Sequence, residues 1–161
     1  MPTEDLLTDD ACRTLAQRPG FLIRRLHQIH VALFMEECAE FKITPVQYSV
    51  LTVLASKPDL DQVSLGAQIG MDRTTMTGVL TRLVERGLLA RRPGLADRRV
   101  KLVSITEAGR ALLRHIDVSA GRAHDRTVAP LSDEDRSVFL RCLANLVEVN
   151  NDYGRAPLHL P

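Results

Sequence analysis

The chain has 161 residues, 45% hydrophobic and 25% charged, which predicts one globular core and excludes disordered, collagen-like and disulfide-rich chains. No apolar run approaches the roughly 20 residues of a membrane-spanning helix, and residues 1–10 lack the basic start of a signal peptide, so we expect a cytoplasmic protein with no membrane partner. The net charge of +1 is unevenly distributed, because residues 64–104 hold eight basic and three acidic residues, a net +5, against −4 elsewhere.

Two helices are predicted first along the chain. One is long and amphipathic, from about Pro19 to Phe41, and its apolar stripe consists of Leu22, Leu26, Ile29 and Leu33. The next is expected from Pro45 to about Ser56. Thr44 and Gln47 have the spacing of a capping box around Pro45, and proline is favoured at the first helical position.

A helix-turn-helix pattern follows. Ser64 is expected to cap a short helix over Leu65–Ile69, and Asp72 to cap a third helix that continues to Gly87. Gly70 lies between them and supports a tight turn, because glycine adopts backbone conformations that are costly to other residues.

The hydrophobic period changes after Gly87. Leu88–Arg92 and Val100–Ile105 read as the strands of a hairpin, joined by a turn rich in charge and in strand breakers. Two long helices complete the chain, one starting at Thr106 and Glu107 and one capped by Ser132 and running to about Asn151. The apolar face of the last helix contains Phe139, Cys142, Leu143, Leu146 and Val147. The predicted fold class is mainly α, with a small β-wing and about six helices.

The third helix has the composition of a DNA recognition helix. Such a helix presents short polar and basic side chains on one face, because an α-helix fits the major groove and reads base edges with them. Arg73 is suited to paired hydrogen bonds with guanine, and threonine hydroxyls and methyls to phosphates and thymine. The proposed contacts here are Ser64, Arg73, Thr74, Thr75, Thr77, Thr81 and Arg82. A merely solvated face is the alternative, although threonine is a poor helix former.

The hairpin tip carries Asp97, Arg98 and Arg99. Arginines on a short loop are suited to the narrow minor groove, where the negative potential is enhanced. Asp97 is expected to orient an arginine through a paired hydrogen bond. The basic region around the hairpin and the third helix therefore predicts a surface for double-stranded DNA.

The chain resembles the MarR family of bacterial regulators. The resemblance rests on residues 43–51 (ITPVQYSVL), 84–89 (VERGLL), 97–99 (DRR) and 105–109 (ITEAG), and extends over most of the chain. It implies a homodimer built by the first and last two helices, bound to a palindromic operator. We therefore divide the chain into a dimerisation arm (1–43), a winged helix-turn-helix lobe (44–105) and C-terminal dimerisation helices (106–161).

The resemblance also implies a ligand pocket between the dimerisation helices and the DNA-binding lobe. Its expected residues are Arg25, His27, His30 and Tyr48. Residues 18–30 (RPGFLIRRLHQIH) look like those of regulators of aromatic or nicotinate catabolism. A repressor released by an aromatic carboxylate, or by its hydroxylated derivative, is therefore predicted.

Other functions fit the sequence less well. Oxidation sensing by a thiol is an alternative, but neither Cys12 nor Cys38 has the position of the reactive cysteine in family thiol sensors, and Cys38 is surrounded by glutamates. A metal site at His27 and His30, with His115 and His124, lacks any supporting motif. No catalytic motif or cofactor signature is present, which disfavours an enzyme. A winged-helix protein-interaction module stays open as a further alternative.

Overall fold

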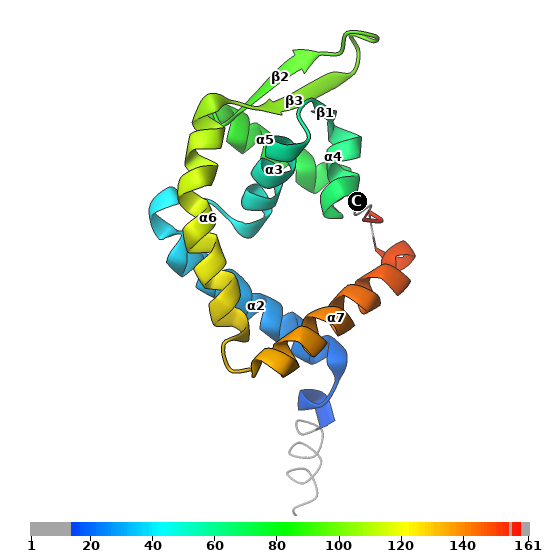
Figure 1. Ribbon diagram of the computed structural model, residues 1–161. Coiled ribbons are helices and arrows are strands. Elements are labelled where there is room, and N and C mark those ends of the chain that lie inside the picture. Colours follow the sequence, from blue (N-terminus) through cyan, green and yellow to red (C-terminus); the bar gives the residue numbers. More distant parts are fainter. Residues whose placement is uncertain (1–13, 155, 159–161) are drawn as a thin grey trace, which may run out of the picture.

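The computed structural model describes residues 14–154 and 156–158, and shows a mainly helical fold with a small antiparallel sheet (Figure 1). This confirms the predicted fold class. In chain order the elements are α2 (Pro19–Glu37), η1 (Ala39–Phe41), α3 (Pro45–Ser56), β1 (Leu60–Asp61), α4 (Gln62–Ile69), α5 (Arg73–Glu85), β2 (Leu89–Pro93), β3 (Lys101–Ile105), α6 (Glu107–Val128), α7 (Asp133–Val149) and η2 (Asn151–Tyr153).

Side-chain caps fix the starts of most of these helices. The predicted capping box is confirmed: Thr44 Oγ1 accepts from the Gln47 main-chain N–H at 3.3 Å, and Gln47 Oε1 accepts from the Thr44 N–H at 3.0 Å. Asp72 and Ser132 cap α5 and α7 as expected, and Thr106 caps α6. Each cap gives a partner to a main-chain N–H that has none within its own helix.

The start of α4 differs from the prediction. The helix begins at Gln62, and its N-cap is Asp61 rather than Ser64. The Asp61 carboxylate accepts from the main-chain N–H groups of Val63 and Ser64, both at 2.9 Å, and from the Ser64 hydroxyl at 2.6 Å. These hydrogen bonds, led by the one from the Ser64 side chain, lower the pKa of Asp61. A carboxylate that accepts three hydrogen bonds caps the helix, so Ser64 lies inside it.

The sheet has one more strand than the sequence predicted. β2 and β3 form the expected hairpin, with Leu89 opposite Ile105 and Pro93 opposite Lys101. The additional strand β1 pairs with the other edge of β3, so the strand order is β1-β3-β2. Because β1 directly precedes α4, this pairing ties the base of the wing to the helix-turn-helix.

One hydrophobic core joins the helix-turn-helix to the wing and to α6. Its members are buried aliphatic residues from nearly every element, with Phe34 and Cys38 contributed by the end of α2. The fully buried side chains include Leu51, Leu54, Leu65, Met76, Leu80, Leu83 and Ile116. The buried side chains of α5 all lie on the face that packs into this core, so the core packing fixes the position of the helix.

The long helices extend away from this core (Figure 1). α2 packs along α6, and Glu37 joins them through ion pairs to Arg122 and Arg126 at 2.8 and 2.7 Å. The Arg122 hydrogen bond, followed by that from Arg126, lowers the pKa of Glu37. In contrast, α7 contains no buried residue, and apolar side chains along its length remain exposed in the single chain.

Gly109 provides a test of the junction between the wing and α6. A Cβ atom at this position would lie 2.3 Å from the Leu88 carbonyl oxygen and 2.7 Å from Ile105 Cγ1. The Thr106 N–H holds that carbonyl in place at 3.0 Å. We therefore expect Gly109→Ala to lower the free energy of unfolding by about 1–3 kcal/mol, the usual range for overpacking.

Gly121→Ala is the matched control, because nothing lies within 4 Å of a Cβ atom built at that position in the same helix. It should stabilise the helix by up to about 1 kcal/mol. Denaturant unfolding at one fixed protein concentration measures both changes. Equal stability of the two variants would contradict the close approach at Gly109.

Candidate nucleic-acid interface and ligand pocket

Helix α5 is anchored by one face and exposed on the other. Met76, Val79, Leu80 and Leu83 are buried in the core and form one face of the helix. The opposite face leaves exposed Arg73, Thr74, Thr75, Thr77 and Arg82, with Thr81 half-buried beside them. The predicted recognition face of α5 is therefore exposed to solvent, and the hairpin of β2 and β3 projects from the same lobe (Figure 1).

Three threonines on this face use their hydroxyl hydrogen within the chain. Thr75 donates to Asp72 Oδ2 at 2.8 Å, and Thr77 and Thr81 each donate to the carbonyl oxygen four residues earlier at 2.9 Å. A hydroxyl has only one hydrogen to donate, so in this arrangement these three offer DNA a methyl group and a lone pair. A phosphate that one of these three hydroxyls contacts as a donor therefore replaces a hydrogen bond within the chain. Within the described residues, Thr74 makes no such bond.

Gln62 connects α4 to the start of α5, and sequence reasoning missed it. Its Nε2 donates to the Arg73 carbonyl oxygen at 3.1 Å and to Thr77 Oγ1 at 2.7 Å. Both bonds leave the Arg73 guanidinium uninvolved. The contact therefore fixes the backbone from which the Arg73 side chain projects.

At the wing tip, the structure changes the role expected of Asp97. Its Oδ1 accepts from the main-chain N–H of Arg99 at 2.9 Å, and no hydrogen bond to an arginine side chain accompanies it among the described residues. Asp97 therefore shapes the turn instead of orienting a guanidinium. Arg98 and Arg99 are exposed on this turn.

A basic groove lies between the start of α5 and the wing. It has a volume of about 480 Å³, and its cations are Arg73, Arg91, Arg99 and Lys101. Arg91 and Lys101 were not predicted as contacts, although the basic character of both hairpin strands was visible in the sequence. Two other cations of the basic region have structural partners: Arg86 donates to main-chain carbonyls next to η1, and Arg92 pairs with Asp59.

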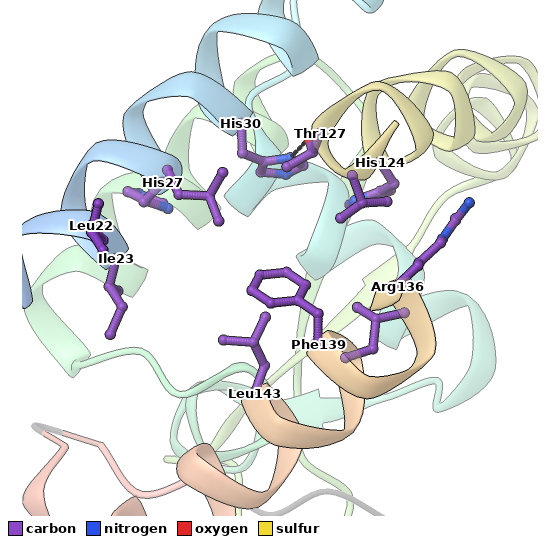
Figure 2. A pocket seen from close by; sticks show the side chains of 12 residues that line it. Leu22, Ile23, His27, His30, His124, Thr127, Arg136, Phe139 and Leu143 are labelled. Carbon is purple, nitrogen blue, oxygen red and sulfur yellow. Dashed lines mark hydrogen bonds between the residues drawn. The ribbon is translucent and has the colours of Figure 1, made fainter. Parts of the chain in front are cut away.

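A second, largely apolar pocket of about 580 Å³ lies between α2, the end of α6 and α7 (Figure 2). Its lining consists of Leu22, Ile23, Leu26, His27, His30, His124, Thr127, Val128, Arg136, Phe139, Leu140 and Leu143. Two of the four predicted ligand residues, His27 and His30, belong to it. Four further lining residues were not predicted from the sequence: His124, Thr127, Arg136 and Phe139. The chain reverses direction between α6 and α7, and only the fold brings these helices together.

The other two predicted ligand residues lie outside this lining. Arg25 is exposed, and its Nη1 lies 3.4 Å from Gln28 Oε1. Tyr48 packs against Phe34 with ring centroids 5.7 Å apart, and its hydroxyl donates to Asp117 Oδ1 at 3.1 Å. Burial, and next the negative charge of Asp117, raise the pKa of Tyr48.

His30 is the best-connected polar group of the pocket. Its Nδ1 lies 2.8 Å from Thr127 Oγ1, and its ring stacks on His124 with centroids 4.9 Å apart. Burial lowers the pKa of His30, and the nearby His124 and His27 lower it further. The neutral imidazole is therefore favoured at His30.

The cysteines give no support to a redox role. Cys38 is buried, and burial followed by the charge of Glu37 raises the pKa of its thiol, which disfavours the reactive thiolate. Cys142 is exposed on α7, and Cys12 lies outside the described residues.

Across 14–154 and 156–158, no three His, Cys, Asp or Glu side chains converge as metal ligands. No helix in that part of the chain combines the length and apolar character needed to cross a membrane.

Comparison with known proteins places these features in a family. Residues 43–101 match the model of the MarR family. The transcriptional repressor NicR of Pseudomonas putida is 26% identical over 146 residues, which cover 91% of this chain and 92% of NicR.

Two solved structures share the fold at higher identity. The PcaV transcriptional regulator of Streptomyces coelicolor, in complex with its natural ligand, is 35% identical, with a TM-score of 0.78 over 83% of this chain and 94% of PcaV. BpsR of Bordetella bronchiseptica, whose DNA binding is regulated by 6-hydroxynicotinic acid, is 32% identical, with a TM-score of 0.78 over 81% and 94% of the two chains.

Sequence, fold and site agree in this assignment. The capping box and the hairpin lie where the sequence predicted them, and each of the two matches covers 94% of the solved chain. The protein is a DNA-binding transcriptional regulator and not an enzyme. It belongs to the MarR family of winged helix-turn-helix regulators.

Proposed function

We propose that the protein is a repressor that binds a palindromic operator as a homodimer and is released by an aromatic carboxylate. The observation that carries the proposal is the largely apolar, histidine-containing pocket that α7 closes against α2 and α6. Such a pocket, with a few polar groups among apolar walls, is typical of a small-molecule site. The regulation of BpsR by 6-hydroxynicotinic acid supports this ligand class.

The DNA contacts follow from the exposed basic surface. We assign base contacts in the major groove to Arg73 and to the threonine face of α5, with Arg82 near the flanking phosphates. Ser64 is assigned to the same phosphates, and its hydroxyl would have to leave Asp61 to donate to one. Arg98 and Arg99, and with them Arg91 and Lys101 of the basic groove, are assigned to the backbone and minor groove of the adjoining turn. An operator inside the bacterial cytoplasm is the expected partner.

The dimer is proposed from the apolar faces of the long helices. Leu22 and Ile29 on α2, and Leu146 and Val147 on α7, are each between 41% and 52% exposed in the single chain. Exposed apolar faces of this extent mark an interaction surface, and self-association is the usual solution. The division at residues 43 and 105 follows, with residues 1–43 and 106–161 assigned to dimerisation.

The position of the pocket suggests how a bound ligand releases the DNA. Its walls belong to the helices assigned to dimerisation, while α6 continues into the wing through the Thr106 cap. The dimer can adopt a state in which the spacing of the two recognition helices fits the operator and a state in which it does not. A ligand that binds the second state more tightly raises its population and so weakens DNA binding.

The test is titration of benzoate, hydroxybenzoate and nicotinate derivatives into the complex with native operator, followed by gel shift. We expect at least one acid to release the DNA, and His30→Ala to keep operator affinity while losing most of this response. His115→Ala, on the exposed side of α6, is the control that should respond as the wild type does. Failure of every acid at millimolar concentration would contradict the proposed signal.

A further inference from the structure

Residues 156–158 lie against the turn of the helix-turn-helix, although they are distant from it in sequence. A Cβ atom built on Gly70 would lie 3.6 Å from the Ala156 carbonyl oxygen and 3.7 Å from Leu158 Cβ. Ala156 and Leu158 are half-buried, and Figure 1 shows this part of the chain beside α4. We call residues 156–158 the brace. Because Gly70 ends α4, the brace contacts the lobe where α4 turns into α5.

Asn151 holds the brace to the end of α7. Its Nδ2 donates to the Leu158 carbonyl oxygen at 2.8 Å, and its Oδ1 accepts from the Leu158 main-chain N–H at 2.7 Å. One side-chain amide thus pairs with both main-chain groups of Leu158, and the reversed amide would place donor against donor and acceptor against acceptor. Asn151 is half-buried and directly follows the residue that caps α7. The two bonds therefore join the brace to α7 in a defined geometry.

The brace also lies beside the start of the recognition helix. Ala156 and Pro157 line a hollow of about 260 Å³, and Gln62 and Arg73 line the same hollow. Gln62 donates to the Arg73 carbonyl oxygen at 3.1 Å and so holds the first residue of α5. The end of α7 is therefore connected, through the brace, to the part of the lobe that is assigned to DNA.

These contacts hold the far end of α7, which has little other support. None of the residues Asp133–Val149 is buried. Near its start α7 is joined to α6 by the ion pair of Arg136 Nη2 with Asp125 Oδ1 at 2.6 Å, and at its end Asn151 and the brace join it to the lobe. A helix held at both ends has a fixed direction, whereas a helix held at one end can turn about it. The brace therefore sets the direction of α7 relative to the lobe.

We propose that Asn151 and the brace are positioning elements for operator recognition, because they fix the separation of the two recognition helices in the dimer. The inference rests on the proposed homodimer, in which α7 belongs to the interface, and adds the residues that determine which spacing of half-sites is bound. A loosened brace leaves each lobe intact but allows several separations. The fraction of dimers with the operator spacing then falls, and the apparent affinity falls with it.

Asn151→Asp is the first test. The carboxylate keeps the acceptor for the Leu158 N–H but places an oxygen, in place of the amide donor, against the Leu158 carbonyl oxygen. We expect about threefold to tenfold weaker binding to the native operator, because fewer dimers have the competent spacing. The variant should also discriminate less against operators whose half-sites are moved apart or together. Asn145→Asp makes the same change on the exposed, polar side of α7 and should behave as the wild type does.

Fluorescence anisotropy with one half-site and with differently spaced pairs separates a change of spacing from damage to the lobe. Asn151→Asp should remain dimeric by light scattering and should bind one half-site as the wild type does. Unchanged operator affinity and spacing preference would overturn the inference, as would a monomeric variant or an equal loss on the single half-site. A wild type that does not prefer two half-sites to one would instead overturn the proposed homodimer.

Leu158→Ser loosens the brace at its other contact and introduces no charge. It removes Leu158 Cδ1, which lies 3.9 Å from a Cβ atom built on Gly70. The variant should show the same reduced preference for the native spacing, and a full preference would contradict the role of the brace.

The contact itself can be measured without DNA. Hydrogen exchange at the Leu158 amide, followed by NMR, should be slow in the wild type and faster in Asn151→Leu, which lacks the acceptor. A wild-type amide that exchanges as fast as one in an unfolded chain would overturn the inference.

Discussion

Replacing Arg73 by alanine should lower the affinity for the native operator by about 1–3 kcal/mol and leave the affinity for random duplex nearly unchanged. Arg73 starts α5, its side chain is exposed, and it lines the groove between recognition helix and wing. The variant lacks the guanidinium to which we assign a paired hydrogen bond with guanine. The fold should survive, because Gln62 holds the carbonyl oxygen of this residue, which alanine retains.

Arg99→Ala is the matched comparison for Arg73→Ala. Arg99 is exposed at the wing tip, where phosphate and minor-groove contacts are expected. The loss of its side chain should lower the affinities for operator and for random DNA by similar factors. It should also reduce the slope of log affinity against log salt concentration by about one. Fluorescence anisotropy at several salt concentrations measures both properties. The base-reading role of Arg73 fails if its variant keeps the wild-type ratio of operator to random affinity.

The parts of the fold that sequence predicted correctly depend on short-range patterns. Thr44 and Gln47 are three residues apart, and their reciprocal bonds need nothing outside α3. Asp72 likewise caps α5 through the main-chain N–H of Thr75, three residues later. Leu80 and Leu83 lie on one face of α5 and are buried together, because the buried face of an amphipathic helix is set by its own spacing.

The errors arise where two local solutions compete or where distant segments meet. Asp61 and Ser64 were both able to cap α4, and the carboxylate took that position because it accepts three bonds at once. Strand β1 has only two residues and is recognisable through its pairing with β3. Arg136 joins His30 in one pocket only after α7 folds back, a contact that periodicity along one helix does not predict.

Introducing a charge at Leu146 should disrupt the dimer and weaken operator binding. Leu146 lies on the apolar face of α7 and is 52% exposed in the single chain. If this face forms the dimer, Leu146→Glu places a carboxylate in an apolar interface, where an unpaired charge is strongly disfavoured. We expect the variant to become monomeric at micromolar concentration and to bind operator about 10²–10⁴-fold more weakly, because two linked half-site contacts become independent.

Asn145→Glu introduces the same charge one residue earlier, on the polar side of α7 with Arg141 and Glu148, and should remain dimeric with nearly wild-type affinity. Light scattering gives the mass of each variant, and operators with one or two half-sites separate loss of dimerisation from loss of DNA contact. A monomeric Leu146→Glu should bind a single half-site as well as one wild-type subunit does, because α5 and the wing lie outside α7. A dimeric Leu146→Glu with full operator affinity would show that the two copies associate through another surface.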